Sequence, residues 1–245
     1  MKLFKKSFNV LVIMCVSSTV MGHANYMPKD TLDQYPDREY QENSSVYLNM
    51  IISHGCRDND GNTYATKYVG VVFPNKIDLQ SQVYTEDSDG KRYGGNAIMG
   101  IKAAIDNNWR TIRHLTDSVS SYYNHGEKTE DVRSIHWLNG NVPDDMYAEL
   151  KFRVKFPKLD KCVSRLKIYT PTIQYCEGDH ILVWTRKATT LFSEEVISPN
   201  YAPYFEVVRN VVTNPLPDSC STGETLEVEP TAQEIDWYFS PRDKY

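Results

Sequence analysis

Hydrophobic and polar residues alternate along several short stretches of the chain, which is the pattern of a β-strand with one buried face. The alternation is clearest at residues 46–52 and 150–156. Residues 67–73 are rich in β-branched and aromatic side chains and stop at Pro74, which indicates another strand. Further strands are predicted at 109–115, 132–137, 166–169, 173–176, 181–184 and 205–211.

The stretches between these strands carry turn and loop signals. Turns are predicted at residues 57–62, at the Asn-Gly-Asn sequence 139–141 and at the Glu-Gly-Asp sequence 177–179. Residues 78–96 are acidic and glycine-rich, which predicts a loop. Three isoleucines at near-helical spacing predict one short helix at residues 98–105.

Many short strands with a single helix predict an all-β domain, folded as an antiparallel β-sandwich with one short inserted helix. The domain is expected to span residues 23–212. Prolines and acidic residues dominate from Thr213 onward, so residues 213–245 are predicted to form an irregular tail that Cys220 fastens to the domain.

The first 22 residues have the layout of a secretory signal: three lysines, an apolar run from Phe8 to Val16, and small residues before Gly22. The apolar run is too short to cross a bilayer. The protein is therefore expected to be exported, to a periplasm or to the medium. Cleavage after Gly22 makes His23 the mature amino terminus, whereas cleavage after Ala24, which the sequence also suits, removes His23.

The charge of the chain excludes some classes of partner. The formal net charge is −5, and it becomes −8 when the three signal lysines are removed (−5 − 3). An acidic chain without a basic cluster argues against nucleic acid and against an anionic membrane surface as partners. The mature chain contains no long apolar run, so no membrane span is expected.

Four cysteines remain once Cys15 is set aside with the signal: Cys56, Cys162, Cys176 and Cys220. An even number in an exported chain indicates two disulfides, and four cysteines allow three connectivities. Their spacing has no C-x-x-C pair, so neither a zinc site nor a thioredoxin-type motif is indicated.

A mature chain that begins at His23 would offer a free α-amine and an imidazole nitrogen on one residue. Copper(II) prefers imidazole and amine nitrogens in a tetragonal arrangement, so this chelate suits Cu(II). The amine has an unperturbed pKa of about 7.7–8.0, and a bound cation displaces its proton near neutral pH. Copper affinity is therefore expected to fall as the pH drops.

Several motifs occur in an order that resembles one known family. They are His54-Gly55-Cys56 at a strand end, Trp109, Ile135-His136-Trp137 before Gly140, the stretch from Asp144 to Phe152, and the stretch from Gln174 to Asp179 leading to Trp184. Together with His23 and Pro28, they make residues 23–186 resemble the YcnI-like copper-binding domain family.

The resemblance implies an exported immunoglobulin-like β-sandwich that holds one copper ion in a single-histidine brace. His23 matches the brace residue, and Trp184 matches a Trp that covers the site. Cys56 and Cys176 match the cysteine pair of the family, which the resemblance implies is a disulfide.

The resemblance also implies a carboxylate ligand a few residues after the Trp of the turn, and this chain departs from it. No acidic residue follows Trp109 between Arg110 and His114. Three residues are therefore candidates for the remaining metal ligand: His114, Glu127 and Glu149.

The same residues have simpler interpretations. Trp184 lies in a predicted strand, where a large aromatic side chain is commonly part of the core. His54 is expected to be a strand-end histidine hydrogen-bonded to the backbone. His136 lies between two large apolar residues, so its side chain is expected on the opposite, solvated face, and Glu149 is out of phase with its apolar neighbours in the same way.

The sequence thus predicts an exported protein that binds one Cu(II) ion for copper trafficking or homeostasis, with the copper ion and another exported copper-handling protein as partners. No enzyme is expected, because the chain has no G-x-S-x-G elbow, H-E-x-x-H or paired Cys–His signature. Two alternatives remain: a metal-free secreted interaction module that has kept only the fold, and a copper-dependent oxidase.

Overall fold

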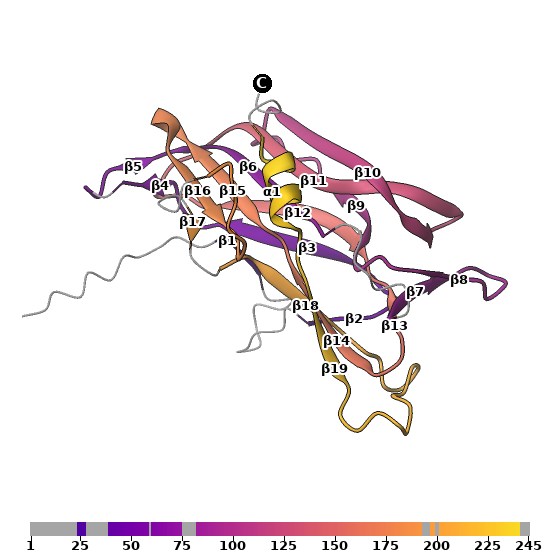
Figure 1. Cartoon of the computed structure of the whole chain (residues 1–245). Coiled ribbons are helices and arrows are strands. Elements are labelled where there is room, and N and C mark those ends of the chain that lie inside the picture. The colour runs from indigo at the N-terminus through magenta and orange to yellow at the C-terminus, as the bar shows by residue number, and fades with distance from the viewer. Residues whose placement is uncertain are drawn as a thin grey trace, which may run out of the picture.

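The structure is a computed structural model, and it describes residues 24–27, 39–58, 60–74, 82–192, 197–198 and 201–240. Strands dominate the described residues (Figure 1). The described residues contain one α-helix. They also contain a single turn of 3-10 helix, η1 (Glu177–Asp179), which forms the predicted turn at residues 177–179. None of these helices is long and apolar enough to cross a membrane. The prediction of an all-β antiparallel sandwich is confirmed.

The sandwich is built on two sheets. The four-stranded sheet has the order β1-β3-β12-β9, with β1 (Ala24–Tyr26), β3 (Ser45–Ile52), β12 (Ala148–Lys155) and β9 (Met99–Ala103). The six-stranded sheet has the order β10-β11-β6-β15-β16-β17, with β10 (Thr111–Tyr123), β11 (Glu127–Val142), β6 (Thr66–Val72), β15 (Thr172–Cys176), β16 (Ile181–Trp184) and β17 (Ile197–Ser198). Alternating apolar residues bury one face of each sheet in a shared core, as expected for a sandwich.

Aromatic side chains fill the centre of this core. The ring of Phe152 on β12 lies 5.4 Å from Phe73 and 6.4 Å from Trp137 between ring centroids. Phe205 closes the end of the core, with its ring 5.1 Å from that of Tyr26. The predicted strands at 46–52 and 150–156 are confirmed, because their alternation matches burial on one face.

Three further sheets, of four, three and two strands, extend the sandwich. The order β19-β14-β18-β2 joins β19 (Glu224–Val228), β14 (Val163–Tyr169), β18 (Tyr204–Val208) and β2 (Glu39–Gln41), with β19 parallel to β14 and β2 parallel to β18. The order β13-β7-β8 joins β13 (Lys158–Leu159), β7 (Val83–Glu86) and β8 (Arg92–Gly94), and β4 (Cys56–Arg57) pairs with β5 (Thr63–Tyr64). The predicted turn at 57–62 is therefore a hairpin turn, and Asp58 accepts the backbone N–H groups of Asp60 and Asn62 within it.

The prediction of a loop over residues 78–96 is wrong for residues 83–86 and 92–94, and residues 78–81 lie outside the described residues. Strands β7 and β8 form a hairpin there, and the Asp87 carboxylate accepts the N–H groups of Asp89 and Lys91 to close its turn. The acidic and glycine-rich composition is that of the hairpin turn, so the turn was predicted correctly. The two short strands on either side of it were not predicted from this composition.

The prediction of a helix at residues 98–105 is also wrong, because strand β9 occupies this stretch and pairs with β12. Gly100 has φ of +58°, which a right-handed helix does not allow, and its N–H donates to the Asp131 carboxylate. Ile105 is 96% exposed, so the third isoleucine of the apparent helical spacing is not part of any buried face.

The predicted turn at residues 139–141 lies inside β11 instead. Asn139 has φ of +57°, and the register with β6 shifts between Leu138 and Val142, so the strand contains a bulge. Gly140 packs under the ring of Trp109, and a Cβ atom at this position would lie 2.5 Å from the indole. This close approach explains why residue 140 is a glycine, which has no Cβ atom.

The prediction of an irregular tail over residues 213–245 is wrong for residues 213–240, the part of it that the structure describes. This part contributes β19 and helix α1 (Ala232–Tyr238), whose first turn is fixed by a capping box between Thr231 and Glu234. The expectation that Cys220 fastens this region is confirmed by the Cys162–Cys220 disulfide.

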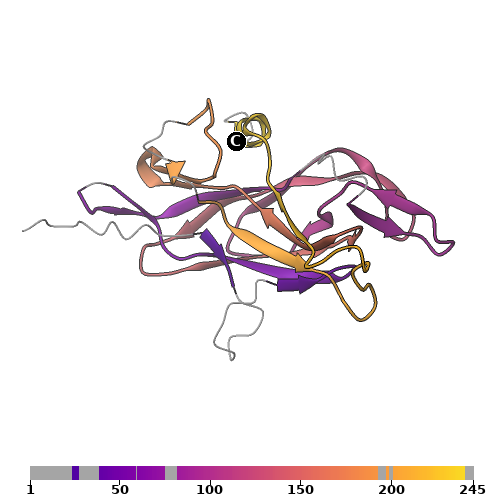
Figure 2. The ribbon, with the colours of Figure 1, turned by 60° about the horizontal axis from the view of Figure 1, so that its bottom comes forward.

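Helix α1 lies on the outer face of the six-stranded sheet (Figure 2). Ile235 and Tyr238 of the helix and the adjacent Phe239 bury this face together with Tyr68, Val72, Leu138, Ile173 and Val183. The six-stranded sheet is therefore covered on both sides, by the sandwich core and by the C-terminal helix.

The prediction that His136 is solvated is wrong, because α1 and Phe239 cover the face of the six-stranded sheet on which His136 lies. The side chain is fully buried, with Nδ1 2.5 Å from the Tyr68 hydroxyl and Nε2 2.6 Å from Ser134 Oγ. Ser134 donates to the carbonyl of Val71, so it accepts from Nε2–H, and Nδ1 accepts from Tyr68. Burial, with a smaller effect of the nearby Arg113 charge, lowers the pKa of His136 to about 3, so the ring is neutral.

Candidate metal centre

The first described residue, Ala24, begins strand β1 at the edge of the sheet β1-β3-β12-β9. Ala24 pairs with Ile52 on β3, and Ile52 pairs on its other side with Ala148 on β12. Ala24 is fully buried, and its carbonyl accepts a hydrogen bond of 3.0 Å from the Tyr201 hydroxyl. The position of residue 24 is therefore fixed by a pairing partner, core packing and a hydrogen bond.

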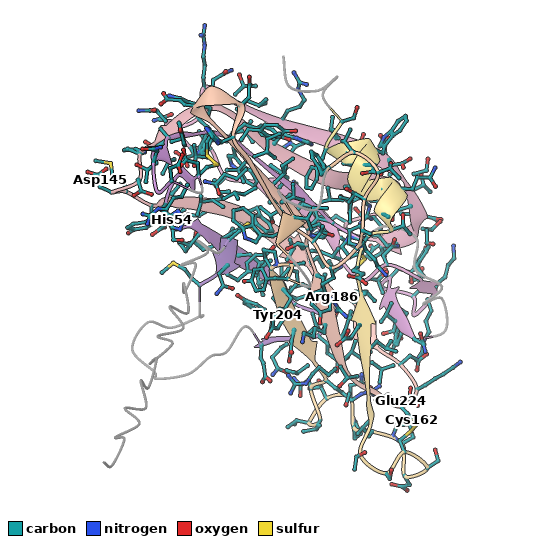
Figure 3. All side chains as sticks on the ribbon, turned by 60° about the vertical axis from the view of Figure 1, so that its left-hand side comes forward. His54, Asp145, Cys162, Arg186, Tyr204 and Glu224 are labelled. Carbon is teal, nitrogen blue, oxygen red and sulfur yellow. A yellow bond between two sulfur atoms is a disulfide. The ribbon has the colours of Figure 1, made fainter. Side chains whose placement is uncertain are left out.

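A histidine and a carboxylate meet just beyond this end of the sheet. His54 follows β3 by two residues, and Asp144 lies in the turn before β12, which the hydrogen bond from Met146 N–H to the Pro143 carbonyl closes at 3.1 Å. His54 Nδ1 is 3.8 Å from Asp144 Oδ1. Figure 3 shows His54 and the neighbouring Asp145 at the same end of the molecule, opposite Cys162 and Glu224.

The two oxygens of Asp144 have different environments. Arg57 Nη2 donates to Oδ2 at 3.2 Å. Oδ1 is buried and has no hydrogen-bond partner, because the 3.8 Å separation from His54 Nδ1 is too long for a hydrogen bond. A buried carboxylate oxygen without a donor is unfavourable unless something else binds it, and a cation is the partner such an oxygen prefers.

The contacts of His54 fix its tautomer. Nδ1 lies 2.5 Å from the carbonyl oxygen of Gly55, which can only accept, so Nδ1 carries a proton and the neutral form of the ring has its lone pair on Nε2. This confirms the predicted hydrogen bond to the backbone. A histidine that donates one N–H to a carbonyl while presenting the other nitrogen is the arrangement usual for metal ligands.

A disulfide holds the residues that follow His54 in the sequence. Cys56 and Cys176 are bonded, with Cα atoms 5.9 Å apart, which confirms the pairing that the family resemblance implied. The amide of Gln174 donates to the His54 carbonyl at 2.9 Å. The residues from His54 to Cys56 are thus tied to β15 by a covalent bond and by a hydrogen bond.

The predicted ligands differ in their placement. His23 lies outside the described residues, as do the signal segment and its cleavage site. Glu149 pairs with Ile51, the residue that pairs with Asn25 on its other side, so it lies in the same sheet as the chain entry. Its Oε2 accepts from Lys151 Nζ at 2.7 Å and from Asn49 Nδ2 at 3.0 Å, and these contacts lower the pKa of the carboxyl.

The structure does not bring His114 and Glu127 together. His114 pairs with Ile135 on β11, eight residues along the strand from Glu127, which corresponds to about 26 Å. His114 Nε2 accepts the N–H of Ala103 at 3.2 Å, and burial lowers the pKa of the ring. Glu127 is exposed and lies 3.6 Å from Lys91 Nζ. Both residues belong to the β10–β11 hairpin of the other sheet.

Trp184 is the last residue of β16 and is almost fully buried in the main core. The same core contains Ala24, so the indole and the entry of the chain share one apolar environment. Packing accounts for its position without a ligand.

The pairing of His54 with Asp144 was missed at the sequence level, although both residues belong to the motifs noted there. The signal lies in their positions, because His54 follows one predicted strand and Asp144 precedes another, and it becomes visible only once these strands are known to be neighbours. No group of three histidine, cysteine or acidic side chains suited to a metal occurs among the described residues.

Comparisons with known proteins give a partial match. The profile of a family described as "Domain of unknown function (DUF1775)" matches residues 94–207, a little under half of the 245 residues. This is the family of the YcnI-like copper-binding proteins. The matched stretch includes Asp144 and ends after Trp184, and it begins after His23 and His54.

No curated protein matches the chain. Among solved structures, a crystal structure of an uncharacterized protein from Nocardia farcinica, described as having an immunoglobulin-like fold, aligns with 69% of this chain and 91% of that chain. The sequence identity is 12% and the TM-score is 0.38.

Proposed function

We propose that the protein is an exported copper-binding protein that holds one Cu(II) ion as cargo, through the amine and imidazole of His23 and the carboxylate of Asp144. The observation that carries this proposal is the buried Asp144 Oδ1, which has no hydrogen-bond partner and lies at the end of the sheet where the chain enters. The match to the YcnI-like family over residues 94–207 supports it.

Covalent continuity makes this ligand set reachable. The Cα atom of His23 is about 3.8 Å from that of Ala24. Ala24 faces its partner Ile52 across about 5 Å, and His54 lies two residues further, about 7 Å along the chain. On this ground we propose that an amine and an imidazole at residue 23 reach the pair formed by His54 and Asp144.

The donors also fit the metal chemically. Two nitrogens and one carboxylate oxygen are the ligand types that suit tetragonal Cu(II). Arg57 binds the second oxygen of Asp144 and so orients the carboxylate, as outer groups commonly do for metal ligands. This geometry favours Asp144 over His114, Glu127 and Glu149, because the first two lie in the other sheet and Glu149 is already held by Lys151 and Asn49.

A carrier, store or delivery factor is the role that such a site serves most simply. The hydrogen-bonded Ser134 and His136 are both fully buried, so a substrate cannot reach this serine–histidine pair, and we take trafficking as the role of the copper site. Two alternatives are open to direct measurement. A copper-dependent oxidase would consume oxygen when the loaded protein is given a reductant, and a metal-free interaction module would bind no copper.

The proposal is tested by Cu(II) titration of protein that starts at His23, with calorimetry and electron paramagnetic resonance as readouts. One equivalent should bind, with a spectrum of nitrogen and oxygen ligands. His23→Ala removes the imidazole of the proposed chelate and should weaken binding at least about tenfold. Asp144→Asn should weaken it similarly, whereas Asp145→Asn, a change of the exposed neighbour, should not.

Two results would overturn the proposal. If His23→Ala bound Cu(II) as tightly as the protein starting at His23, His23 would not be a ligand. If Asp144→Asn and Asp145→Asn had equal effects, Asp144 would not be the third ligand. Circular dichroism of each variant shows whether the fold is retained.

A further inference from the structure

The outer face of the four-stranded sheet carries a row of polar side chains that crosses three adjacent strands. Tyr47 on β3 pairs with Arg153 on β12, and Arg153 pairs on its other side with Lys102 on β9. The neighbouring residues Leu48 and Phe152 belong to the buried core, so the side chains of this row point away from the core. Tyr47 is 81% exposed, which shows that this part of the face is open.

Two cations of this row face each other without a compensating carboxylate. Arg153 and Lys102 are direct cross-strand partners, so their Cα atoms are about 4.5–5.5 Å apart. Arg153 Nη2 donates to Ser45 Oγ at 2.8 Å, and among the described residues no carboxylate forms an ion pair with either cation. Like charges directly opposite each other in a sheet are destabilising. The sheet therefore contains a repulsion that nothing within the described chain offsets.

A third cation adds to this charge. Lys155 lies two residues after Arg153 on the same face of β12, and its Nζ donates to a backbone carbonyl at 2.9 Å. Burial, with a smaller effect of the Arg153 charge, lowers the pKa of Lys155. The fourth cation of the face, Lys151, is balanced by Glu149, whose Oε2 is 2.7 Å from its Nζ. The row and Lys155 thus keep an excess of positive charge.

The fold assembles this positive surface from separate parts of the sequence. The cations come from two strands and alternate with core residues in β12, so the sequence alone shows no basic cluster. Their juxtaposition is unexpected in a chain of formal net charge −5. Local arrangements that lower stability without a gain inside the protein are typical of functional surfaces. The surface formed by Tyr47, Lys102, Arg153 and Lys155 is called the basic face below.

The charge of the rest of the protein favours a small acidic partner over an extended one. An anionic membrane or a nucleic acid reaches beyond the basic face and also meets the acidic remainder of the chain, which repels it. A short acidic segment meets the basic face alone, because charges beyond the Debye length of about 8 Å are largely screened at physiological salt. The exposed ring of Tyr47 also suits a protein partner, since tyrosine is enriched in protein–protein interfaces.

We propose that the basic face is a docking surface for an acidic segment of another protein, whose carboxylates bind Lys102, Arg153 and Lys155 beside the ring of Tyr47. The partner replaces the repulsion between the opposed cations by attraction. This inference is independent of the proposed copper binding, because none of the four residues is a candidate metal ligand.

The test measures binding of a fluorescently labelled hexaglutamate peptide to the metal-free protein by fluorescence anisotropy. The wild type should bind the peptide, with an affinity that falls as salt is added. Lys102→Glu and Arg153→Glu should each weaken binding at least about fivefold at low salt, because each replaces an attraction by a repulsion. Lys102→Gln should also weaken binding, and it should not lower the melting temperature, because it removes a like-charge contact.

Lys161→Glu is the matched control. Lys161 is exposed in the turn between β13 and β14, so its reversal changes the net charge of the protein by the same amount at a site outside the four-stranded sheet. This variant should change the affinity for the peptide by less than about twofold. Circular dichroism of each variant shows that the fold is retained.

Four results would overturn the proposal. Wild-type protein that does not bind the peptide would lack the docking surface. Equal losses in Lys161→Glu and Lys102→Glu would show that net charge alone governs binding. A lower melting temperature of Lys102→Gln would give this cation a role in the stability of the sheet instead. Tighter binding to phosphatidylglycerol vesicles than to the peptide, lost in Lys102→Glu, would assign the basic face to a membrane surface.

Discussion

The neutral, buried His136 should make the stability of the protein depend on pH in a defined range. In the folded protein its pKa is lowered to about 3, chiefly by burial, whereas in the unfolded chain it returns to the ordinary value of 6.5. Between these values the unfolded chain binds a proton that the folded protein does not. The stability contributed by this residue is therefore complete above pH 6.5 and is lost progressively as the pH falls toward 3.

The size of the effect follows from linkage. At pH 5 the unfolded state gains RT ln(1 + 10^1.5), about 2 kcal/mol, from protonating one group of pKa 6.5, and the folded state gains almost nothing from a group of pKa about 3. The free energy of unfolding should thus fall by about 2 kcal/mol between pH 8 and pH 5 because of His136 alone. Typical domains have 5–15 kcal/mol in total, so this loss is easily measured.

The assay is urea unfolding of the copper-free, disulfide-intact protein at pH 8 and pH 5, with a chelator present. Other groups titrate in the same range, so the comparison is with His136→Gln, whose amide can still accept from Tyr68 and donate to Ser134 but does not titrate. The variant should be less stable at pH 8 and lose about 2 kcal/mol less than the wild type on acidification. Equal losses in both proteins would refute the reasoning.

Three further predictions concern the framework. Replacing both Cys56 and Cys176 by serine opens a link between residues 120 apart and should cost about 2–5 kcal/mol, read as a lower melting temperature; an unchanged melting temperature would contradict the disulfide. Gly140→Ala places a methyl group 2.5 Å from the Trp109 ring and should cost about 1–3 kcal/mol and alter tryptophan fluorescence, and a neutral result would show that the indole can move. Ile235→Ala should cost about 2–5 kcal/mol if α1 packs on the sheet, while Gln233→Ala on its exposed side should change stability by less than about 0.5 kcal/mol in the same unfolding assay.

The strands that were predictable from the sequence are those with one buried and one polar face. Residues 46–52 and 150–156 alternate because β3 and β12 bury a single side in the sandwich. The apparent helix at 98–105 failed because three apolar residues at helical spacing carry no information about Gly100, whose positive φ excludes a helix. Short apolar stretches are ambiguous in this way whenever the backbone contains a glycine.

The face of His136 could not be predicted from its own strand. Alternation correctly placed it opposite Ile135 and Trp137, but that face is covered by α1, whose sequence lies about 100 residues further along the chain. The capping box formed by Thr231 and Glu234 is a local sequence signal for the start of this helix.

The candidate metal centre was only partly predictable for a related reason. The cysteine pair came from the family resemblance and is confirmed. The neighbourhood of His54 and Asp144 depends on the pairing of β3 with β12, two strands separated by about two fifths of the chain, and sequence patterns within each strand do not fix which strand is its partner. His23 stays a prediction, because it lies outside the described residues.

The position of the C-terminal region has a consequence for how the protein is made. Strand β19 pairs with β14, Cys220 bonds to Cys162, and α1 covers the outer face of the six-stranded sheet. Residues synthesised late therefore complete layers begun by residues synthesised much earlier. A chain that has emerged only as far as Pro230 leaves an apolar sheet face bare, a state in which β-rich intermediates aggregate. Correct maturation thus requires residues 231–239 to cover the sheet before exposed sheet faces of different chains associate.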